Sequence, residues 1–247
     1  MVYEEVGDVI MKFIKQLGGI ILVSYLMLIP VSTNAAIVNG GFESGLTAWS
    51  SAGDALVDDG FFGGSFPTEG ALQALVTTLS EAGDFTPGLS FDDAVPVADL
   101  EAFLGLSGEL IGLDATEGSA IMQSFTGNAG DTLAFDWNFL TDDAGLSGDF
   151  AFVLIDGSLS MLADANSFLL GASSGFFLDE TGYQSLAHTF GSTGLHTLAF
   201  GVVDAPDEIG ASGLLIDNIT LTPIPLPASL LLFVSGLMGL FVSLRKS

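Results

Sequence analysis

Basic residues are almost absent from this chain. Of its 247 residues only four are Lys or Arg, against 30 Asp and Glu, and none of the four lies between Gln16 and Leu244. This long acidic segment can form no salt bridge to Lys or Arg, and it cannot neutralise the phosphates of nucleic acid or anionic lipid. Its self-repulsion must be relieved by spacing, salt or bound cations, so divalent cations are its natural partners. Simple acidic solubility in a saline or matrix environment is the alternative explanation.

Cysteine is absent too, and Pro, Tyr and Trp are scarce. The chain has no Cys, eight Pro, three Tyr and two Trp, whereas it has 32 Gly and 20 Phe. Disulfides therefore cannot stabilise it. Frequent Gly and Phe are typical of an all-β domain with many turns rather than of a disordered chain. The segment from Ile37 to Thr222 is long enough for one domain with a substantial core.

The N-terminal segment has the pattern of a secretory signal peptide. A pair of lysines precedes an apolar run, residues 17–31, which is followed by small residues. This order predicts cleavage after Ala35, with Ala36 as the second choice. Residues 1–35 are therefore the predicted signal peptide, with the true start at Met11. An uncleaved N-terminal anchor is the alternative.

The C-terminal segment has the length of a membrane span. Residues 226–244 carry no charge and are followed by Arg245 and Lys246. A helix of this length just crosses a hydrocarbon core of about 30 Å. The basic pair would stay on the cytoplasmic side, so the acidic body would lie outside. A buried core helix is the alternative.

A short motif, Ser-Gly-Leu and Gly-Leu steps and a basic pair accompany this predicted span, namely Pro225, Leu226, Pro227 and Ala228, residues 235–240, and the terminal Arg245 and Lys246. Together these residues resemble the PEP-CTERM sorting signal of Gram-negative bacteria, in its Pro-Leu-Pro-Ala variant. Leu226 stands where the family usually has Glu, and the basic cluster is shorter than usual. The resemblance implies transient anchoring in the inner membrane and recognition by an exosortase, a membrane-embedded protease. Processing near the Pro-x-Pro motif would release the body or attach it to the outer surface or the exopolysaccharide matrix.

The body between the two ends has the pattern of short strands separated by turns. Residues 132–140 place four alternate apolar side chains on one face, namely Leu133, Phe135, Trp137 and Phe139. Further strands are predicted over residues 71–77, 119–125, 150–155, 183–190, 195–203 and 214–221. One helix is predicted over residues 97–106, with Pro96 at its start. Trp49 and Trp137 are predicted to be structural residues rather than sugar-binding platforms.

The predicted fold class is an all-β, jelly-roll-like β-sandwich with one short inserted helix. It covers residues 36–222, between the signal helix and a sorting tail over residues 223–247 that contains the transmembrane helix. The segments Asn39–Glu43 and Ile216–Ile219 resemble the two ends of galactose-binding-like jelly rolls, which include carbohydrate-binding modules. In that group the early Glu and the late Asp often meet at a structural Ca²⁺, so the resemblance implies a Ca²⁺ site at Glu43 and Asp217. Through the segments 115–121, 130–142, 149–153, 201–204 and 214–218, most of residues 103–221 is also similar to a body domain recurrent in PEP-CTERM proteins, for which no activity is known.

Two acidic loops form a weaker candidate metal site. Each follows one predicted strand and precedes another; the residues are Asp142, Asp143 and Asp149 in the first loop and Asp204, Asp207 and Glu208 in the second. Ca²⁺ prefers six to eight oxygen ligands, which such loops can supply. If the strands that lead into the loops run the same way, both loops lie at one end of the sandwich. Solvated loop carboxylates are the alternative.

A match to the Gly-x-Ser-x-Gly motif of hydrolases is explained by chance. It occurs at residues 171–175, with Asp179 and His188 following in hydrolase order. The motif needs a strand before the Ser and a helix after it, and the segment predicts neither the helix nor room for a triad. His188 and His196 lack a third His or a Cys for zinc. The chain is therefore predicted not to be an enzyme.

These observations favour an exported, non-enzymatic protein of the cell surface or the exopolysaccharide matrix. Its role is predicted to be structural or adhesive, with Ca²⁺ as a bridging ion. A carbohydrate-binding module for extracellular polysaccharide is the alternative. Exosortase and the membrane are the predicted partners during sorting, and nucleic acid is not a partner.

The sequence predicts processing at both ends. In exosortase-competent cells the native protein should begin near Ala36 and lose its tail close to Pro225, because each cleavage signal has its flanking apolar run and basic pair. Intact-mass analysis of the native protein measures both ends at once. Recovery of the full-length, membrane-inserted chain from such cells would contradict the prediction.

Overall fold

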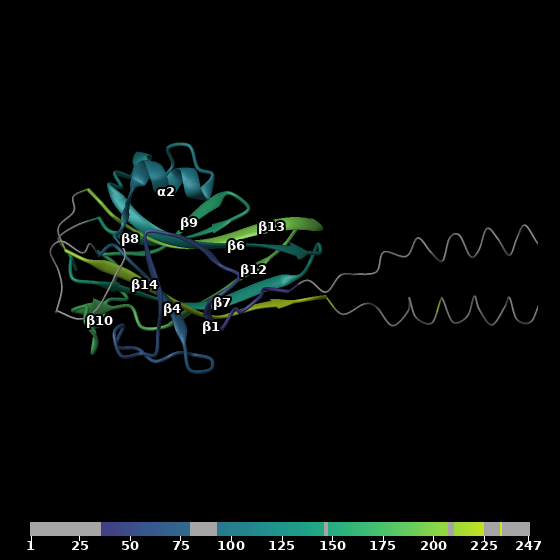
Figure 1. The fold of residues 1–247 in the computed structure, drawn as a ribbon, viewed down its shortest axis with the longest axis horizontal. Helices are drawn as coiled ribbons and strands as arrows, with labels where there is room; N and C mark the ends of the chain where they lie inside the picture. Colours follow the sequence, from purple (N-terminus) through teal and green to yellow (C-terminus); the bar gives the residue numbers. More distant parts are fainter. Residues whose placement is uncertain (1–35, 80–92, 146–147, 207–209, 225–232, 234–247) are drawn as a thin grey trace, which may run out of the picture. The chain divides into compact units, whose positions relative to one another are not determined.

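The computed structural model describes residues 36–79, 93–145, 148–206, 210–224 and 233. The predicted signal peptide and, apart from Phe233, the predicted transmembrane helix lie outside these ranges. Among the described residues, no helix has both the length and the apolar character needed to span a membrane. The described residues form two antiparallel sheets, one of seven and one of six strands, which pack face to face (Figure 1).

The seven-stranded sheet is centred on the long strands β7 and β14. Its hydrogen-bonded order is β10-β11-β7-β14-β4-β3, and β12 also pairs with β7. The strands are β3 (Asp54–Asp58), β4 (Gln73–Thr77), β7 (Thr132–Thr141), β10 (Gly171–Ala172), β11 (Asp179–Glu180), β12 (Gln184–Thr189) and β14 (Ser212–Thr222).

The six-stranded sheet is centred on β13. Its order is β2-β6-β13-β8-β9, with β5 also paired to β6. The strands are β2 (Ser50–Ala52), β5 (Val95–Pro96), β6 (Glu117–Gly127), β8 (Phe150–Ile155), β9 (Ser158–Asp164) and β13 (Gly194–Asp204). A short strand β1 (Glu43–Leu46), the helix α2 (Val97–Leu104) and a 3₁₀ turn η1 (Ile111–Leu113) complete the described elements.

The core between the sheets contains the alternating face of β7. Leu133, Phe135, Trp137 and Phe139 are all buried in it, as their spacing predicts. The ring of Phe135 meets that of Phe200 on β13 edge to face, with centroids 4.7 Å apart. Both tryptophans are buried in this core, which confirms their predicted structural role.

A second apolar cluster covers the outer face of the six-stranded sheet. Helix α2 packs Leu100 and Leu104 there, against alternate side chains of β8 such as Phe152 (Figure 1). Both faces of β8 are therefore covered, which explains its continuous apolar run. The helix ends at Leu104 because Gly105 adopts the left-handed conformation with φ 73°, so the predicted end at residue 106 is wrong.

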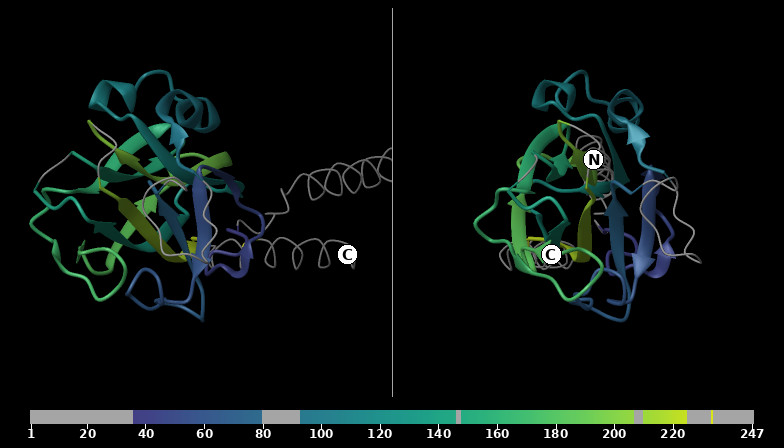
Figure 2. Two further views of the ribbon diagram at one scale, coloured as in Figure 1. Left: turned by 60° about the vertical axis from the view of Figure 1, so that its left-hand side comes forward. Right: turned by 90° about the vertical axis from the view of Figure 1, so that its left-hand side faces the viewer.

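A third cluster covers the outer face of the seven-stranded sheet. It joins Phe62, Phe177 and Leu215 with neighbouring apolar side chains. Phe62 and Phe177 come from two connections, residues 59–72 between β3 and β4 and residues 173–178 between β10 and β11, whereas Leu215 lies on β14. The two connections lie at the lower side of both views in Figure 2, in blue and in green.

The predicted all-β sandwich is confirmed for the described residues, and each of the seven predicted strands is present within about two residues of its bounds. The prediction missed β1, β2, β3 and β9, and the two-residue strands β5, β10 and β11. Most of these strands are short or lie at the border of a sheet. Such strands are fixed by their neighbours more than by their own residues.

Candidate functional site

A long connection on the outer face of the seven-stranded sheet is held in place by carboxylates. It comprises residues 59–72, here called the platform loop, and has no regular secondary structure. Its beginning is fixed by Asp58, whose carboxylate accepts the amide protons of Gly60, Phe62 and Gly63 at 2.9–3.2 Å. Asp58 is 5% exposed, so this contact is shielded from water.

The middle of the platform loop is fixed by two aspartates of the sheet. Asp217 Oδ2 accepts the amide protons of Thr68 and Glu69, both at 2.7 Å. Thr68 also donates its hydroxyl to Asp136 Oδ2 at 2.9 Å. Asp136 and Asp217 are directly opposite on β7 and β14, where two like charges repel each other. The donors from the platform loop and from Asn218 offset this repulsion.

The end of the platform loop is fixed by Glu43. Its Oε1 accepts the amide protons of Ala71 and Leu72 at 2.6 and 2.9 Å, and these bonds lower the pKa of Glu43. The predicted pair Glu43 and Asp217 is therefore brought to one structural element: Asp217 holds the middle of the platform loop and Glu43 its end.

The oxygens of this pair do not by themselves complete a calcium shell. Glu43 Oε1 and Asp217 Oδ2 each accept two amide protons, whereas Ca²⁺ requires six to eight oxygens. Within the described ranges no group of three or more acidic or His side chains could hold a metal ion. Calcium at Glu43 and Asp217 stays a prediction.

Two phenylalanine rings of the platform loop stand in solvent. Phe61 is 85% exposed and Phe66 is 77% exposed, while Phe62 between them is buried. The Phe66 ring rests on Gly60, where an added Cβ would be 2.6 Å from Phe66 Cδ1. The flanking Ser65 donates its hydroxyl to Glu180 Oε2 at 2.6 Å, so the exposed ring is carried by a fixed backbone.

A second segment locks the platform loop. This lock segment comprises residues 173–178. Its Phe176 ring stacks on Phe62 with ring centroids 5.0 Å apart, and the Phe176 amide donates a hydrogen bond to the Phe62 carbonyl. Gly64 and Gly175 meet so closely that a Cβ on either would collide with the backbone of the other. The two connections therefore form one rigid surface.

Asp136, which accepts the hydroxyl proton of Thr68, is half-buried. Burial by itself opposes charge on Asp136, but hydrogen bonds from Ser185, Asn218 and Thr68 outweigh it and lower the pKa of this carboxyl. Tyr183 lies near this carboxyl. Burial, and then the charges of Asp217 and its acidic neighbours, raises the pKa of Tyr183, so the phenol stays protonated and donates to Gln73 Oε1.

Sequence reasoning did not single out the platform loop. The available signal was the run Gly60-Phe61-Phe62-Gly63-Gly64 directly after two aspartates. Two aromatic residues in a glycine-rich turn are an unusual use of apolar side chains. The partners Asp136 and Glu180 gave no local signal.

The two predicted acidic loops do lie together at one end of the sandwich. Gly148 donates to the Ala205 carbonyl at 2.6 Å, and Ala205 donates to Asp149 Oδ1 at 3.0 Å. Asp143 is buried beside Gly210. Asp142 instead accepts the Leu178 amide at 2.7 Å. Residues 207–209, which include the predicted ligands Asp207 and Glu208, lie outside the described ranges.

At the centre of this end Asp149 and Asp204 form a buried pair of acids. Each is 1% exposed, and Asp204 Oδ1 has no hydrogen-bond partner within the described part of the chain. Burial, followed by the charge of Asp149, raises the pKa of Asp204 to about 9. Asp204 is therefore a neutral acid beside an ionised one, and this pair does not make a six-oxygen calcium shell.

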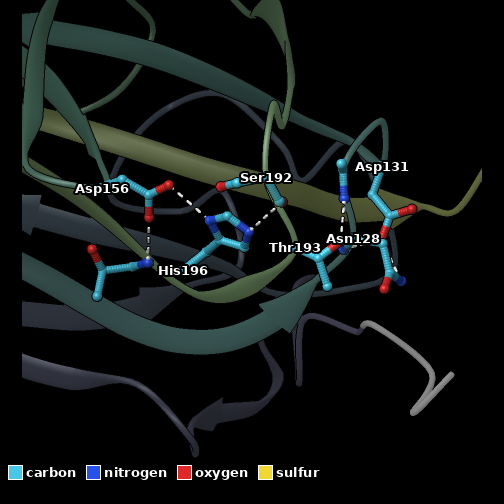
Figure 3. Close-up of polar contacts among 8 residues, drawn as sticks. Asn128, Asp131, Asp156, Ser192, Thr193 and His196 are labelled. Atoms are coloured by element: carbon cyan, nitrogen blue, oxygen red, sulfur yellow. Dashed lines mark hydrogen bonds and ion pairs between the residues drawn. The ribbon is translucent and has the colours of Figure 1, made fainter. Parts of the chain in front are cut away.

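A buried imidazole lies at the opposite end of β13. His196 is 3% exposed; its Nδ1 is 2.7 Å from Asp156 Oδ2 and its Nε2 is 3.2 Å from the Ser192 carbonyl oxygen (Figure 3). Both partners only accept hydrogen bonds, so both contacts are satisfied together only when both ring nitrogens carry a proton. His196 ties β13 to its neighbouring loops and is not a zinc ligand in this arrangement.

The residues of the hydrolase-like motif do not converge. Asp179 is opposite Thr141 and His188 is opposite Leu133. These partners are eight residues apart along β7, or roughly 27 Å at about 3.4 Å per residue. Ser173 accepts the amide proton of Gly175, and no helix follows it before β11. A Ser-His-Asp triad cannot form from these three side chains.

Comparison with known proteins shows distant likeness only. No protein-family model and no curated protein matches the chain. Solved structures with a similar fold include the module TmCBM61 in complex with β-1,4-galactotriose, at 12% identity over 77% of this chain and 99% of that chain, TM-score 0.42. A cleaved adhesin domain of Lys-gingipain from Porphyromonas gingivalis W83 matches at 9% identity over 77% and 98%, TM-score 0.41. A Family 16 carbohydrate-binding module matches at 12% over 75% and 98%, TM-score 0.36.

The Asp149–Asp204 pair predicts an unusual pH dependence of stability. Because the pKa of Asp204 is raised to about 9 from roughly 3.9 in an unfolded chain, folding takes up a proton between these values. The stabilisation is complete below about pH 4 and is lost as the pH rises towards 9, by at most ~1.4 kcal/mol per pH unit for one group. Urea unfolding of wild type and Asp204→Asn between pH 5 and 9 measures this slope. In Asp204→Asn the free energy of unfolding should fall less steeply with rising pH than in the wild type. Equal slopes in the two proteins would contradict a raised pKa at Asp204.

Proposed function

We propose that this chain is an exported, non-catalytic protein of the cell surface or extracellular matrix whose β-sandwich binds extracellular polysaccharide. One observation carries the proposal: the platform loop exposes Phe61 and Phe66 to solvent, and its Ser65 and Thr68 hydroxyls donate to the carboxylates of Glu180 and Asp136. Exposed apolar surface that is rimmed by polar groups marks an interaction site.

The chemistry of a sugar matches this surface. A pyranose ring presents C–H groups on its faces, which stack on aromatic rings, and hydroxyl groups at its rim, which donate to carboxylates. The backbone under Phe66 is fixed on both sides by Ser65 and Thr68. Little conformational freedom is lost when a ligand binds such a preformed surface, and this favours affinity.

The export and sorting of the protein rest on its two ends. The signal-peptide pattern, the apolar run of residues 226–244 and the motif from Pro225 to Ala228 support delivery through the inner membrane and recognition by exosortase. The body would then reach the outer surface or the matrix, where extracellular polysaccharide is present. Intact-mass analysis of the native protein tests this part.

A structural or adhesive role through cation bridging is the second candidate. A net charge of −26 with no Lys or Arg between Gln16 and Leu244 favours it, because Ca²⁺ can join acidic surfaces that otherwise repel each other. Light scattering discriminates the two candidates. Association of the purified body in millimolar Ca²⁺, but not in NaCl of equal ionic strength, supports bridging; a monomer in both salts counts against it.

The sugar proposal predicts that two exposed rings carry the affinity. Removing both by Phe61→Ala and Phe66→Ala should weaken binding at least about tenfold, or ~1.4 kcal/mol, while stability stays within about 0.5 kcal/mol because both rings are exposed. A glycan array with and without Ca²⁺ selects the ligand, and affinity electrophoresis in gels containing that polysaccharide measures its binding.

The matched control is Leu195→Ala. Leu195 is an apolar side chain 72% exposed on the six-stranded sheet, so its removal should leave binding unchanged. If the wild-type protein binds no glycan, or if the control weakens binding as much as the double variant, the proposed site is wrong.

A further inference from the structure

The charge around Phe66 has one sign only. Its neighbours Ser65 and Thr68 donate their hydroxyls to Glu180 and Asp136, so the backbone that carries the exposed ring is tied to a carboxylate on each side. No Lys or Arg exists between Gln16 and Leu244 to neutralise them. The imidazole of His196 is buried in the six-stranded sheet against Asp156. A ligand that reaches this ring meets a negative potential that the protein does not cancel.

Glu180 has an oxygen to offer to a ligand. Both of its hydrogen bonds, from Ser65 and from Asn138, go to Oε2. Within the described part of the chain its Oε1 accepts none, and the side chain is only half-buried. An ionised carboxylate can accept about four hydrogen bonds, so Glu180 has capacity left at the edge of the platform loop.

An ammonium group on the ligand suits the uncompensated negative charge and the available oxygen of Glu180 better than a neutral or acidic substituent does. Its hydrogen bond to a carboxylate is charge-assisted and roughly twice as strong as a neutral one. The face of an aromatic ring also attracts a cation. A uronate, sulfate or phosphate group, by contrast, would be repelled by Glu180 and Asp136 with no basic side chain to compensate.

We propose that the platform loop prefers polysaccharide with free amino groups, that is, a hexosamine polymer that is at least partly unacetylated, and rejects acidic polysaccharide. Phe66 is the stacking ring, and Glu180 Oε1 accepts from the sugar ammonium. This inference rests on the proposed function, because it names the class of glycan that the same site takes.

A pair of ligands that differ only in charge tests the inference. Chito-oligosaccharides of one length are compared in the fully deacetylated and the fully acetylated form, with oligogalacturonate as the acidic ligand. Titration calorimetry at mildly acidic pH, where the free amines are protonated, should give the highest affinity for the deacetylated form and no binding of oligogalacturonate. Added NaCl should weaken the binding of the deacetylated oligomer but not that of the acetylated one, because salt screens the contact between the ammonium group and the carboxylate.

The Glu180→Gln variant separates charge from shape. It should weaken binding of the deacetylated oligomer about tenfold and change binding of the acetylated form less than about twofold, because Gln keeps a neutral acceptor. Asp114→Asn is the matched control. It removes one exposed charge after η1, at a left-handed position with φ 62° that Asn tolerates, and should change neither affinity.

Each outcome decides between the two proposals. If the acetylated or the acidic oligomer binds as tightly as the deacetylated one, the inference is overturned and polysaccharide binding stands. The same conclusion follows if Glu180→Gln weakens both chito-oligosaccharides equally in a variant whose melting temperature matches wild type. If no oligosaccharide and no array glycan binds, the proposed function fails together with the inference.

Discussion

The structure depends on hydrogen bonds from backbone amides to carboxylates. In most proteins Lys and Arg neutralise part of the acidic charge, but here the peptide N–H groups of loops take that place. Asp58 holds three amides, Glu101 holds three amides after α2, and Asp217 and Glu43 hold the platform loop. A hydrogen bond to a charged group contributes about 1.5–3 kcal/mol, and each bond also satisfies an amide that regular structure would otherwise have to pair. One type of contact therefore orders loops and lowers the repulsion within an acidic chain.

The same contacts connect folding to the proposed function. The carboxylates that fix the platform loop also give its surface a negative charge, so the order of the loop and its choice of ligand have one source. Phe61 and Phe66 remain exposed because the residues between and around them are already engaged: Phe62 in the stack with Phe176, and Ser65 with Glu180. Exposed rings on a fixed backbone resemble a binding surface more than a failure of packing.

Buried ionisable groups away from this loop show how the chain handles charge without Lys or Arg. At one end, Asp204 keeps its proton beside Asp149, because burial disfavours its charged form and the charge of Asp149 adds to this effect. At the other end, Asp156 meets the imidazole of His196, which packs against the ring of Phe190. The two ends thus use a neutral acid and an imidazole–carboxylate contact where other proteins use ion pairs to Lys or Arg.

The sequence by itself determined the strands with a strong pattern and much of the acidic geometry. The alternation in β7 and the unbroken apolar run of β8 follow from which faces are covered. The two acidic loops were predicted at one end on the condition that the strands leading into them run the same way. The sequence also brought Glu43 and Asp217 together, on the strength of a resemblance. Only the tertiary structure decided the platform loop, because its partners are remote: Ser65 and Glu180 are 115 residues apart and Thr68 and Asp217 are 149 apart. No local pattern encodes which carboxylate accepts from which loop residue across such separations. These contacts form only after β3, β4, β14 and β7 have paired side by side in one sheet.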